Sequence, residues 1–222
     1  LCTAKEQPQL LAGKTITITA GPTREPLDPV RFISNHSSGK MGYALAEAAL
    51  QLGATVNLIS GPVTIKAPLG ANLINIESAE QLLNESLIYA PQSDAFIGCA
   101  AVADYRAAEI ATQKMKKQGD ELTLTLTKNP DVIAAIANLK QNRPYTVGFA
   151  AETQNVESYA KGKLKNKNLD MICANDVSKS GLGFNSDHNA LTLYWHNEQL
   201  ELPTTSKIEI ARKVIEQLAK HL

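Results

Sequence analysis

Residues 21–42 read GPTREPLDPVRFISNHSSGKMG and connect a strand-like run, TITITA at residues 15–20, with a helix-like run that begins near Lys40. A strand, a glycine-containing turn and a helix N-terminus make a place for phosphate, because backbone N–H groups and the helix dipole point outward there. The spacing matches neither G-x-G-x-x-G nor a P-loop, and the connection far exceeds the usual length of about two to six residues. The stretch therefore predicts an α/β nucleotide site with its own chemistry. Its anion-binding and hydrogen-bonding side chains are Arg24, Arg31, Asn35, His36, Ser37, Ser38 and Lys40.

The composition is that of an ordinary globular protein. The 222 residues, 44% hydrophobic and 20% charged, suit one sizeable α/β domain. A formal net charge of zero argues against a large basic surface for nucleic acid. No apolar run is long enough to span a membrane and no secretory signal is visible, so we expect a cytoplasmic protein with neither a nucleic-acid nor a membrane partner.

The cysteines also indicate a cytoplasmic protein. Cys2, Cys99 and Cys173 are odd in number and widely spaced, which argues against a disulfide framework and for a reducing compartment. Cys99 and Cys173 lie at the ends of apolar runs, which favours small buried core residues over nucleophiles. No Cys/His spacing indicates a zinc site.

Strand-like and helix-like segments alternate along the chain. This alternation predicts a Rossmann-like, three-layer α/β fold with a mostly parallel sheet. Residues 121–128, which alternate Leu and Thr, and residues 190–195 are predicted to be antiparallel additions at a dimer edge. Residues 1–12 are expected to form a linker or N-terminal tail, and residues 13–222 a single domain. The other predicted strands are 14–20, 54–60, 73–76, 94–100, 145–150 and 170–174, and the predicted helices are 40–52, 78–89, 130–139, 155–167 and 205–221.

Four predicted strand ends are rich in glycine or polar residues, at residues 21–40, 98–104, 148–153 and 174–177. In an open α/β sheet, ligands bind at the carboxyl ends of the strands, near the point where strand order reverses. These four ends are therefore expected to surround one crevice. The side chains that they bring there are Asn35, Asp104, Glu152, Asn175 and Asp176.

Lysines give two further hypotheses. Lys114, Lys116 and Lys117 form either a solvated surface run or a flap that brings ammonium groups onto phosphates. Lys163 and Lys167 share one helix face at spacing i, i+4, which suits either a solvated face or a triphosphate site.

Several residues of the long connection have more than one interpretation. Glu25 and Asp28 suit a metal ion or a rigid proline-rich turn equally well. His36 is more readily a hydrogen-bonding or exposed residue than a general base, because no acid is obviously paired with it. Ser37 or Ser38 suits the N-cap of the following helix better than a nucleophile.

Seven blocks of the sequence resemble bacterial phosphopantothenate–cysteine ligases, in the order found in that family, between residues 13 and 222. In many bacteria this ligase is the C-terminal half of a bifunctional coenzyme A biosynthesis flavoprotein, whose other half is a flavin-dependent decarboxylase. The chain starts at Leu1 without an initiator Met, so the resemblance implies an excised ligase half, with FMN confined to the absent decarboxylase. The blocks are residues 21–42, AAVADY at 100–105, KMKK at 114–117, NPDV at 129–132, GFAAET at 148–153, ANDV at 174–177 and GFNSDHN at 183–189.

The resemblance implies an enzyme that joins 4′-phosphopantothenate to L-cysteine, using CTP and Mg²⁺. The substrate carboxylate attacks the α-phosphate of CTP, which gives an acyl-cytidylate and pyrophosphate. The cysteine amine then displaces CMP and forms the amide. Two easier steps thereby replace one difficult step, because CMP is a good leaving group. The sequence does not indicate metal ligands, since no acidic cluster stands out.

The resemblance also implies roles for individual residues. Asn35 matches the asparagine that holds the acyl-cytidylate, and Lys114 matches the flap lysine that promotes its formation by neutralising phosphate charge. Lys163 and Lys167 match the triphosphate-binding lysines, so for this pair the solvated face is set aside. The other nucleotide-binding residues implied are Gly98, Cys99, Ala100, Asp104, Pro130, Asp131, Val132, Ile133 and Phe149.

The family is homodimeric, with each active site lined by both subunits, and residues 121–128 and 190–195 are the candidates for a shared sheet. Two other functions stay open. A nicotinamide-dependent oxidoreductase would need a dinucleotide fingerprint and an acid after the second strand, where the sequence has GPV at residues 61–63. A non-catalytic nucleotide-binding module would leave Asn35 and Lys114 unexplained.

Overall fold

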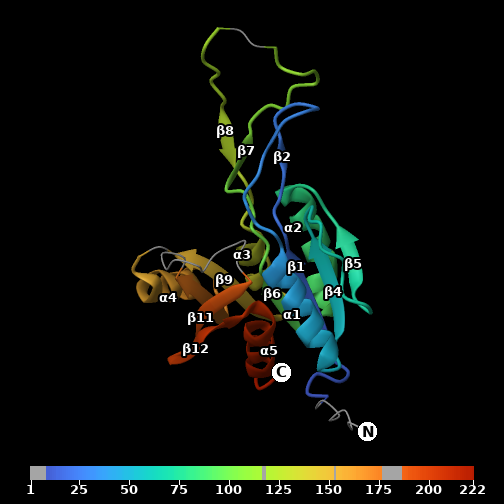
Figure 1. Cartoon of the computed structure of the whole chain (residues 1–222), viewed down its shortest axis with the longest axis vertical. Helices are drawn as coiled ribbons and strands as arrows, with labels where there is room; N and C mark the ends of the chain where they lie inside the picture. Colours follow the sequence, from blue (N-terminus) through green and yellow to red (C-terminus); the bar gives the residue numbers. More distant parts are fainter. Residues whose placement is uncertain (1–8, 117–118, 153, 177–186) are drawn as a thin grey trace.

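The computed structural model describes residues 9–116, 119–152, 154–176 and 187–222. Its body is an eight-stranded sheet covered by helices, and an arm extends from the carboxyl ends of the central strands (Figure 1). The strands of the main sheet are β1 (Thr15–Ala20), β4 (Thr55–Ser60), β5 (Asn72–Asn75), β6 (Ala95–Gly98), β9 (Tyr145–Glu152), β10 (Met171–Asp176), β11 (His188–Trp195) and β12 (Glu198–Ser206). The helices are α1 (Lys40–Gln51), α2 (Ala79–Tyr89), the short 3₁₀ helix η1 (Ala90–Gln92), α3 (Val132–Ala137), α4 (Val156–Asn166) and α5 (Lys207–Leu218).

The strand order confirms the predicted Rossmann-like fold. The sheet runs β12-β11-β10-β9-β6-β1-β4-β5, and all pairs from β10 to β5 are parallel. The chain thus builds outward from β1 through β4 to β5, then returns to the other side of β1 with β6. In a doubly wound sheet of this order, the ligand crevice lies at the reversal, outside the carboxyl ends of β1 and β6.

Both faces of the sheet are buried, which explains why β1 can alternate Thr and Ile without being half exposed. Ile16 and Ile18 are fully buried in the largest core cluster, which α1 and α5 share. Thr17 and Thr19 are also buried, and their hydroxyl groups are hydrogen-bonded: Thr17 pairs with the Ser93 hydroxyl group at 2.7 Å, and Thr19 accepts backbone N–H groups beyond β6. Helices α2, α3 and α4 contribute to the smaller core clusters.

The arm consists of two antiparallel ribbons that the sequence analysis did not predict as pairs. One ribbon pairs β2 (Glu25–Pro26) with β3 (Phe32–Ile33), and the other pairs β7 (Tyr105–Ala107) with β8 (Leu126–Lys128). Strands β2 and β7 contact each other, and Figure 1 shows both ribbons extending together beyond the carboxyl edge of the sheet. The long connection after β1 and the segment after β6 therefore form one projection.

Two predicted edge strands are placed differently by the structure. Within residues 121–128 only the last three form a strand, β8. This strand pairs with β7 in the arm and not in the main sheet, because both belong to the connection between β6 and α3, which leaves the sheet and returns to it. Residues 190–195 lie within β11, which is antiparallel as predicted but interior, since β12 pairs along it and forms the edge. The prediction that residues 190–195 are an open edge is therefore wrong.

At one of three helix N-termini the structure agrees with the sequence prediction, and at the other two it differs. Ser78 caps α2 through a complete capping box with Gln81, as its position predicted. Helix α1 begins after Gly39, in a left-handed conformation with φ of 77°, rather than with a serine cap. Helix α3 is capped by Asp131, whose carboxylate accepts the Ala134 N–H group, so the helix begins after the predicted start at residue 130.

The N-terminal segment enters the core before β1. Residues 1–8 lie outside the described residues, whereas Leu11 is fully buried and its N–H group donates to the Leu52 carbonyl group at 2.9 Å. None of the helices in the described part of the chain has the length and apolar character needed to cross a membrane.

Gly61, which follows β4, allows the closest backbone approach near the crevice. A Cβ atom there would lie 1.8 Å from the Pro22 carbonyl oxygen. We predict that Gly61→Ala lowers the free energy of unfolding by about 1–3 kcal/mol, because Pro22 must move. Urea unfolding measures this change.

Gly162, in the interior of α4, is the matched control. A Cβ atom there meets nothing within 4 Å. Gly162→Ala should stabilise the protein by up to about 1 kcal/mol, because glycine is a poor helix former. Equal unfolding free energies for Gly61→Ala and the wild type would contradict the close approach at Pro22.

Candidate active site

The chains that leave β1 and β6 stay paired beyond the sheet. Pro22 and Ala101 form a parallel bridge, the Ala101 N–H group donates to Gly21 O at 2.9 Å, and the Thr23 N–H group donates to Ala101 O at 3.2 Å. The buried Thr23 hydroxyl group also accepts the Ala103 N–H group at 3.0 Å. This pairing fixes both strand ends as one wall at the point where the strand order reverses.

Two cavities adjoin each other along this wall. The first pocket has a volume of about 260 Å³, and the second pocket about 210 Å³. Ala100, Val102 and Phe149 line both, so the pockets meet at these residues. The other residues lining the first pocket are Ser37, Ser38, Gly39, Lys40, Met41, Gly42, Cys99, Ala101, Ala150, Ala151, Asn175, Asn189 and Lys207. The others lining the second pocket are Thr19, Leu82, Phe96, Gly98, Ala103, Asp104, Lys128, Asn129, Pro130, Asp131, Val132, Ile133 and Lys167.

The second pocket gathers most of the residues expected to bind nucleotide. Its floor is the glycine-containing end of β6, where the Thr19 hydroxyl group accepts the N–H groups of Cys99 and Ala100 at 3.2 and 3.1 Å. A Cβ atom on Gly98 would lie 2.3 Å from Ile133 Cδ1, so glycine lets α3 approach the strand end closely. The expected residues that line this pocket are Gly98, Ala100, Asp104, Pro130, Asp131, Val132, Ile133, Phe149 and Lys167.

Asn129 is a structural residue of this pocket that the sequence analysis did not single out for the site. Its side chain is buried and donates to Ala103 O at 2.8 Å, while its N–H group donates to Asp104 O at 2.8 Å. Arg106 donates to its amide oxygen at 3.1 Å. Asn129 therefore holds the segment that carries Asp104, and only the tertiary contact reveals this role.

The two predicted phosphate lysines lie on α4 or at its end, and both are paired with carboxylates. Lys163 Nζ lies 2.6 Å from Glu152 Oε1, and Lys167 Nζ lies 2.8 Å from Asp131 Oδ2. Lys167 lines the second pocket, whereas Lys163 does not. A polyphosphate would have to compete with these carboxylates, which keep the ammonium groups close to the crevice.

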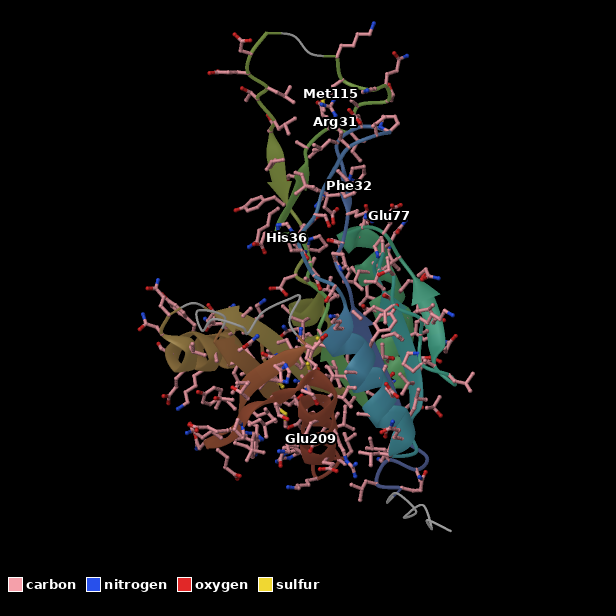
Figure 2. All side chains as sticks on the ribbon, viewed as in Figure 1. Arg31, Phe32, His36, Glu77, Met115 and Glu209 are labelled. Atoms are coloured by element: carbon pink, nitrogen blue, oxygen red, sulfur yellow. The ribbon has the colours of Figure 1, made fainter. Side chains whose placement is uncertain are left out.

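Asn35 ties the long connection to the end of β6. Its amide nitrogen donates to Ala101 O at 2.5 Å, and its amide oxygen accepts the Ser37 N–H group at 3.0 Å. Ala101 and Ser37 line the first pocket, so Asn35 stands directly behind that wall. His36 is exposed and lies near the base of the arm in Figure 2, outside the lining of both pockets.

Lys114 does not line either pocket of its own chain. It precedes Met115, which Figure 2 labels beside Arg31 toward the far end of the arm. Asp28 accepts the Met115 N–H group at 3.1 Å, and Arg31 donates to Met115 O at 2.9 Å. Lys116 follows on the same segment, and Lys117 lies outside the described residues.

Asp28 is the centre of this contact. Its carboxylate accepts the N–H groups of Val30 and Arg31 and pairs with the Arg31 guanidinium group at 2.6 Å. The hydrogen bond from Arg31 holds the pKa of Asp28 well below its usual value, against the opposing effect of burial. Glu25 instead accepts the Ala79 N–H group at the start of α2. Both acids thus fit the rigid-turn interpretation.

The described residues contain two cysteines, Cys99 and Cys173, and both are free thiols. Cys99 lines the first pocket, and burial raises the pKa of its thiol to about 12, so it is not a thiolate nucleophile. Cys173 is fully buried in the core, as predicted. Within the described residues, no group of three His, Cys, Asp or Glu side chains is arranged to hold a metal ion.

The end of β10 is only partly described. Asn175 lines the first pocket, whereas Glu152 reaches the site through its ion pair with Lys163. Asp176 is the last described residue of β10, and Thr153 and residues 177–186 lie outside the described part. Asn189 and Lys207 are first-pocket residues that the sequence analysis missed, because only the fold brings β11 and α5 to α1.

The fold and these pockets define a class: an α/β protein whose ligand crevice lies at the switch point of a doubly wound sheet. Residues 11–222 match the family model described as "DNA/pantothenate metabolism flavoprotein C-terminal domain". The chain belongs to this family. The resemblance identified from sequence motifs is thereby confirmed.

Curated relatives carry the name "Coenzyme A biosynthesis bifunctional protein CoaBC". The protein from Vibrio vulnificus (strain YJ016) is 54% identical over 220 residues, which is 98% of this chain and 55% of that relative. The protein from Escherichia coli (strain K12) is 54% identical over 209 residues, 91% of this chain and 51% of the relative. The chain therefore spans about half the length of the curated relatives it matches.

A solved structure supports the same assignment. The crystal structure of the C-terminal domain of a Coenzyme A biosynthesis bifunctional protein CoaBC matches with a TM-score of 0.82 and 41% identity. The match covers 96% of this chain and 97% of the other. In that relative, the C-terminal domain was therefore solved as a separate domain, and it has the fold of this chain.

We predict that Asp28→Asn frees the segment next to Lys114 while leaving the body folded. Loss of a charged acceptor should raise hydrogen exchange at the Met115 amide by about 10- to 100-fold, because hydrogen bonds to charged groups are the stronger ones. Exchange mass spectrometry of residues 108–116 measures the effect. Glu121→Gln, at an exposed position of the arm, is the control, and equal protection in both variants would contradict the assigned contact.

Proposed function

We propose that this chain is the phosphopantothenate–cysteine ligase half of a bifunctional coenzyme A biosynthesis protein, acting in the cytoplasm. The observation that carries the proposal is the junction of the two pockets at Ala100, Val102 and Phe149. A pocket lined by most of the expected nucleotide-binding residues on one side and a pocket lined by Lys40 and Lys207 on the other suit two substrates that meet at one point. The relatives named as coenzyme A biosynthesis proteins supply the substrate class.

In this mechanism CTP occupies the second pocket. Because Gly98 has no side chain, backbone groups at the end of β6 can contact the cytosine base. The Asp104 carboxylate accepts a hydrogen bond from the base or the ribose. Lys167, and Lys163 from the same helix face, exchange their carboxylate partners for phosphate oxygens. The α-phosphate then lies toward the junction, where the carboxylate of 4′-phosphopantothenate attacks it and pyrophosphate leaves.

Asn35 acts on the intermediate. Its fixed amide adds a dipole without a net charge at the wall where negative charge develops, which is the arrangement that favours electrostatic stabilisation. The L-cysteine amine then attacks the acyl carbonyl carbon, CMP leaves with the bonding electron pair, and the amide forms. Binding both groups at one wall converts this attack into an effectively unimolecular step.

Mg²⁺ fits this site as a companion of the nucleotide. Mg²⁺ commonly uses substrate phosphates, waters and one or two carboxylates rather than an all-protein cage. The described residues offer no such cage, and Asp131 is a carboxylate that lines the second pocket. When bound, the ion would neutralise phosphate charge, with Asp131 as the residue to hold it.

Homodimer formation through the arm explains the position of Lys114. The arm exposes a set of large apolar side chains, which is typical of an interaction surface. Because Lys114 lies on the arm and not in the lining of its own pockets, we infer that it serves the active site of the partner subunit. The exposed apolar residues of the arm are Val30, Phe32, Tyr105, Ile110, Leu122, Leu124 and Leu126.

A nicotinamide-dependent oxidoreductase is not favoured. The strand order suits one, but the connection from β1 to α1 runs through the arm instead of a tight glycine-rich turn. The chain after β4 continues as Gly61-Pro62 with no acid for a ribose. A non-catalytic nucleotide module would leave the first pocket without a role.

The direct test is pyrophosphate release with CTP, Mg²⁺ and 4′-phosphopantothenate, with and without L-cysteine. We expect full turnover to need cysteine and CTP, with ATP a poor substitute. Protein that binds CTP yet releases no pyrophosphate would point to a binding module. Thermal stabilisation by NADH but not by CTP would point to the oxidoreductase.

Two substitutions separate the half-reactions. Asn35→Asp should still form the acyl-cytidylate but convert it slowly, with a loss of about 10²–10³-fold in kcat, because a carboxylate repels the developing charge. Lys114→Gln should slow the first half-reaction. Rapid-quench measurement of pyrophosphate and amide distinguishes them, and normal pyrophosphate release by Lys114→Gln would contradict its role.

Mixing these two inactive variants tests whether Lys114 acts across the dimer. In mixed dimers one site combines the intact Asn35 of one subunit with the intact Lys114 of the other. If Lys114 acts in the partner's site, re-equilibrated equal mixtures should recover about a quarter of wild-type activity. No recovery, with subunit exchange verified by native mass spectrometry, would place Lys114 in the site of its own subunit.

A further inference from the structure

Helix α3 is connected at both of its ends to the turn that follows α4. At the start of α3, the N-cap residue Asp131 pairs with Lys167 at 2.8 Å. At the last residue of α3, the Ala137 carbonyl oxygen accepts hydrogen bonds from Arg143 Nε at 2.7 Å and from the Asn168 amide nitrogen at 2.9 Å. Since Lys167 and Asn168 are neighbours in the chain, both connections hold the same turn.

Arg143 is the centre of the second connection. Besides its contact with Ala137, its guanidinium group donates to Asn168 O at 2.7 Å and pairs with Asp170 at 2.8 Å. Asp170 in turn accepts the Thr146 N–H group at 2.7 Å, which ties the connection to β9. The last carbonyl groups of a helix have no partner inside the helix and carry partial negative charge, so a guanidinium group suits them well. The fixed fork of N–H donors on arginine allows contacts with three segments at once, which a lysine could not make.

The way in which α4 ends fixes the backbone of Lys167. Asn168 has a left-handed conformation with φ of 58°, and its N–H group donates to Lys165 O at 3.2 Å. The Leu169 N–H group donates to Leu164 O at 2.9 Å. These two hydrogen bonds form a Schellman motif in which Lys167 is the C-cap residue. The position of the Lys167 backbone therefore depends on where Asn168 is held.

The sheet beneath α3 and this turn is flat at the point of contact. Gly98 of β6 and Gly148 of β9 are paired in register. A Cβ atom on Gly98 would lie 2.3 Å from Ile133 Cδ1, and a Cβ atom on Gly148 would lie 2.7 Å from Leu169 Cδ1. Glycine at both positions allows close approach but provides no side chain to interdigitate with Ile133 and Leu169. The polar contacts of Arg143 therefore add a lateral restraint that the sheet surface lacks.

The two connections differ in what a bound nucleotide would do to them. Lys167 and Asp131 both line the second pocket. In the proposed function, phosphate oxygens replace Asp131 as the partner of Lys167, so the connection at the start of α3 is lost when the nucleotide binds. Arg143 and Asn168 line neither pocket, so their hydrogen bonds to Ala137 remain.

We propose that Arg143 is a positioning residue for the nucleotide site, which acts with Asn168 to hold Lys167 at the second pocket when phosphate replaces Asp131. This inference rests on the proposed ligase function and deepens it, because it assigns a residue outside both pockets to nucleotide binding. Arg143 contacts neither the nucleotide nor the reacting atoms. Its effect on CTP affinity is therefore exerted through Lys167.

A double-mutant cycle tests whether Arg143 acts through Lys167. Calorimetry would compare CTP binding, with Mg²⁺ present, by the wild type, Arg143→Ala, Lys167→Gln and the double variant. We expect Arg143→Ala to weaken CTP binding by about 10-fold, which is within the range for residues coupled in one hydrogen-bond network. In the Lys167→Gln background, the same substitution should change the affinity by less than about twofold, because the ammonium group that Arg143 positions is absent. Additive losses in the double variant would overturn the proposal.

Arg212→Ala is the matched control, since Arg212 pairs with Glu216 within α5 and lines neither pocket. It should leave CTP affinity unchanged. Asn168→Gly replaces Arg143→Ala if the latter is unfolded by circular dichroism, because glycine keeps the left-handed conformation and removes only the amide. A smaller loss of CTP affinity is expected, and it should again be absent in the Lys167→Gln background.

Hydrogen exchange of residues 164–169 without nucleotide tests the positioning apart from the ligase function. Arg143→Ala should raise exchange at the Asn168 and Leu169 amides by about 10-fold, because the turn opens more readily when its contacts with α3 are lost. Unchanged exchange at these amides would overturn the proposal. Wild-type protein that binds no CTP would contradict the proposed function, whereas equal CTP affinities of the wild type and Arg143→Ala would contradict only the role of Arg143.

Discussion

The site depends on one constraint: the chains that leave β1 and β6 remain hydrogen-bonded to each other after the sheet has ended. Pro22 and Ala101 continue the parallel pairing, and Thr23 extends it through its buried hydroxyl group. A reversal of strand order ordinarily opens a crevice because neighbouring connections diverge. Here two of them are held together, so the crevice acquires a rigid central wall, with one pocket on each side of the junction that the wall creates.

The same pairing explains why one molecule contains both a compact body and an arm. The two paired connections continue outward as the two ribbons, so the arm is a direct extension of the central wall. Where the chain returns from the arm to α1, the Asn35 amide donates to the Ala101 carbonyl group and ties this segment to the end of β6. The first pocket, the second pocket and the arm that carries Lys114 therefore all follow from one backbone arrangement.

Much of the fold could be predicted from the sequence, because hydrophobic periodicity, glycine and capping residues shape the backbone within a few residues of themselves. The parallel sheet followed from the alternation of strands and helices, and the start of α2 and the glycine-rich strand ends followed from local sequence. The arm did not, since its strands are two or three residues long and carry little periodic signal. Lys207 was also missed, because a lone lysine at a helix start gains meaning only when the fold sets it against α1.

The ion-paired turn of Asp28 and Arg31 holds the backbone next to Lys114 through two hydrogen bonds with Met115. Fixing the backbone of a residue costs about 1–2 kcal/mol of conformational entropy. Where such a segment folds over a substrate, that cost reduces the binding affinity. Here the charged turn fixes Met115 in the folded protein. The entropy cost therefore lowers the free energy of unfolding and not the affinity for a ligand. The backbone next to Lys114 is therefore already ordered before any ligand arrives, and binding does not have to order it.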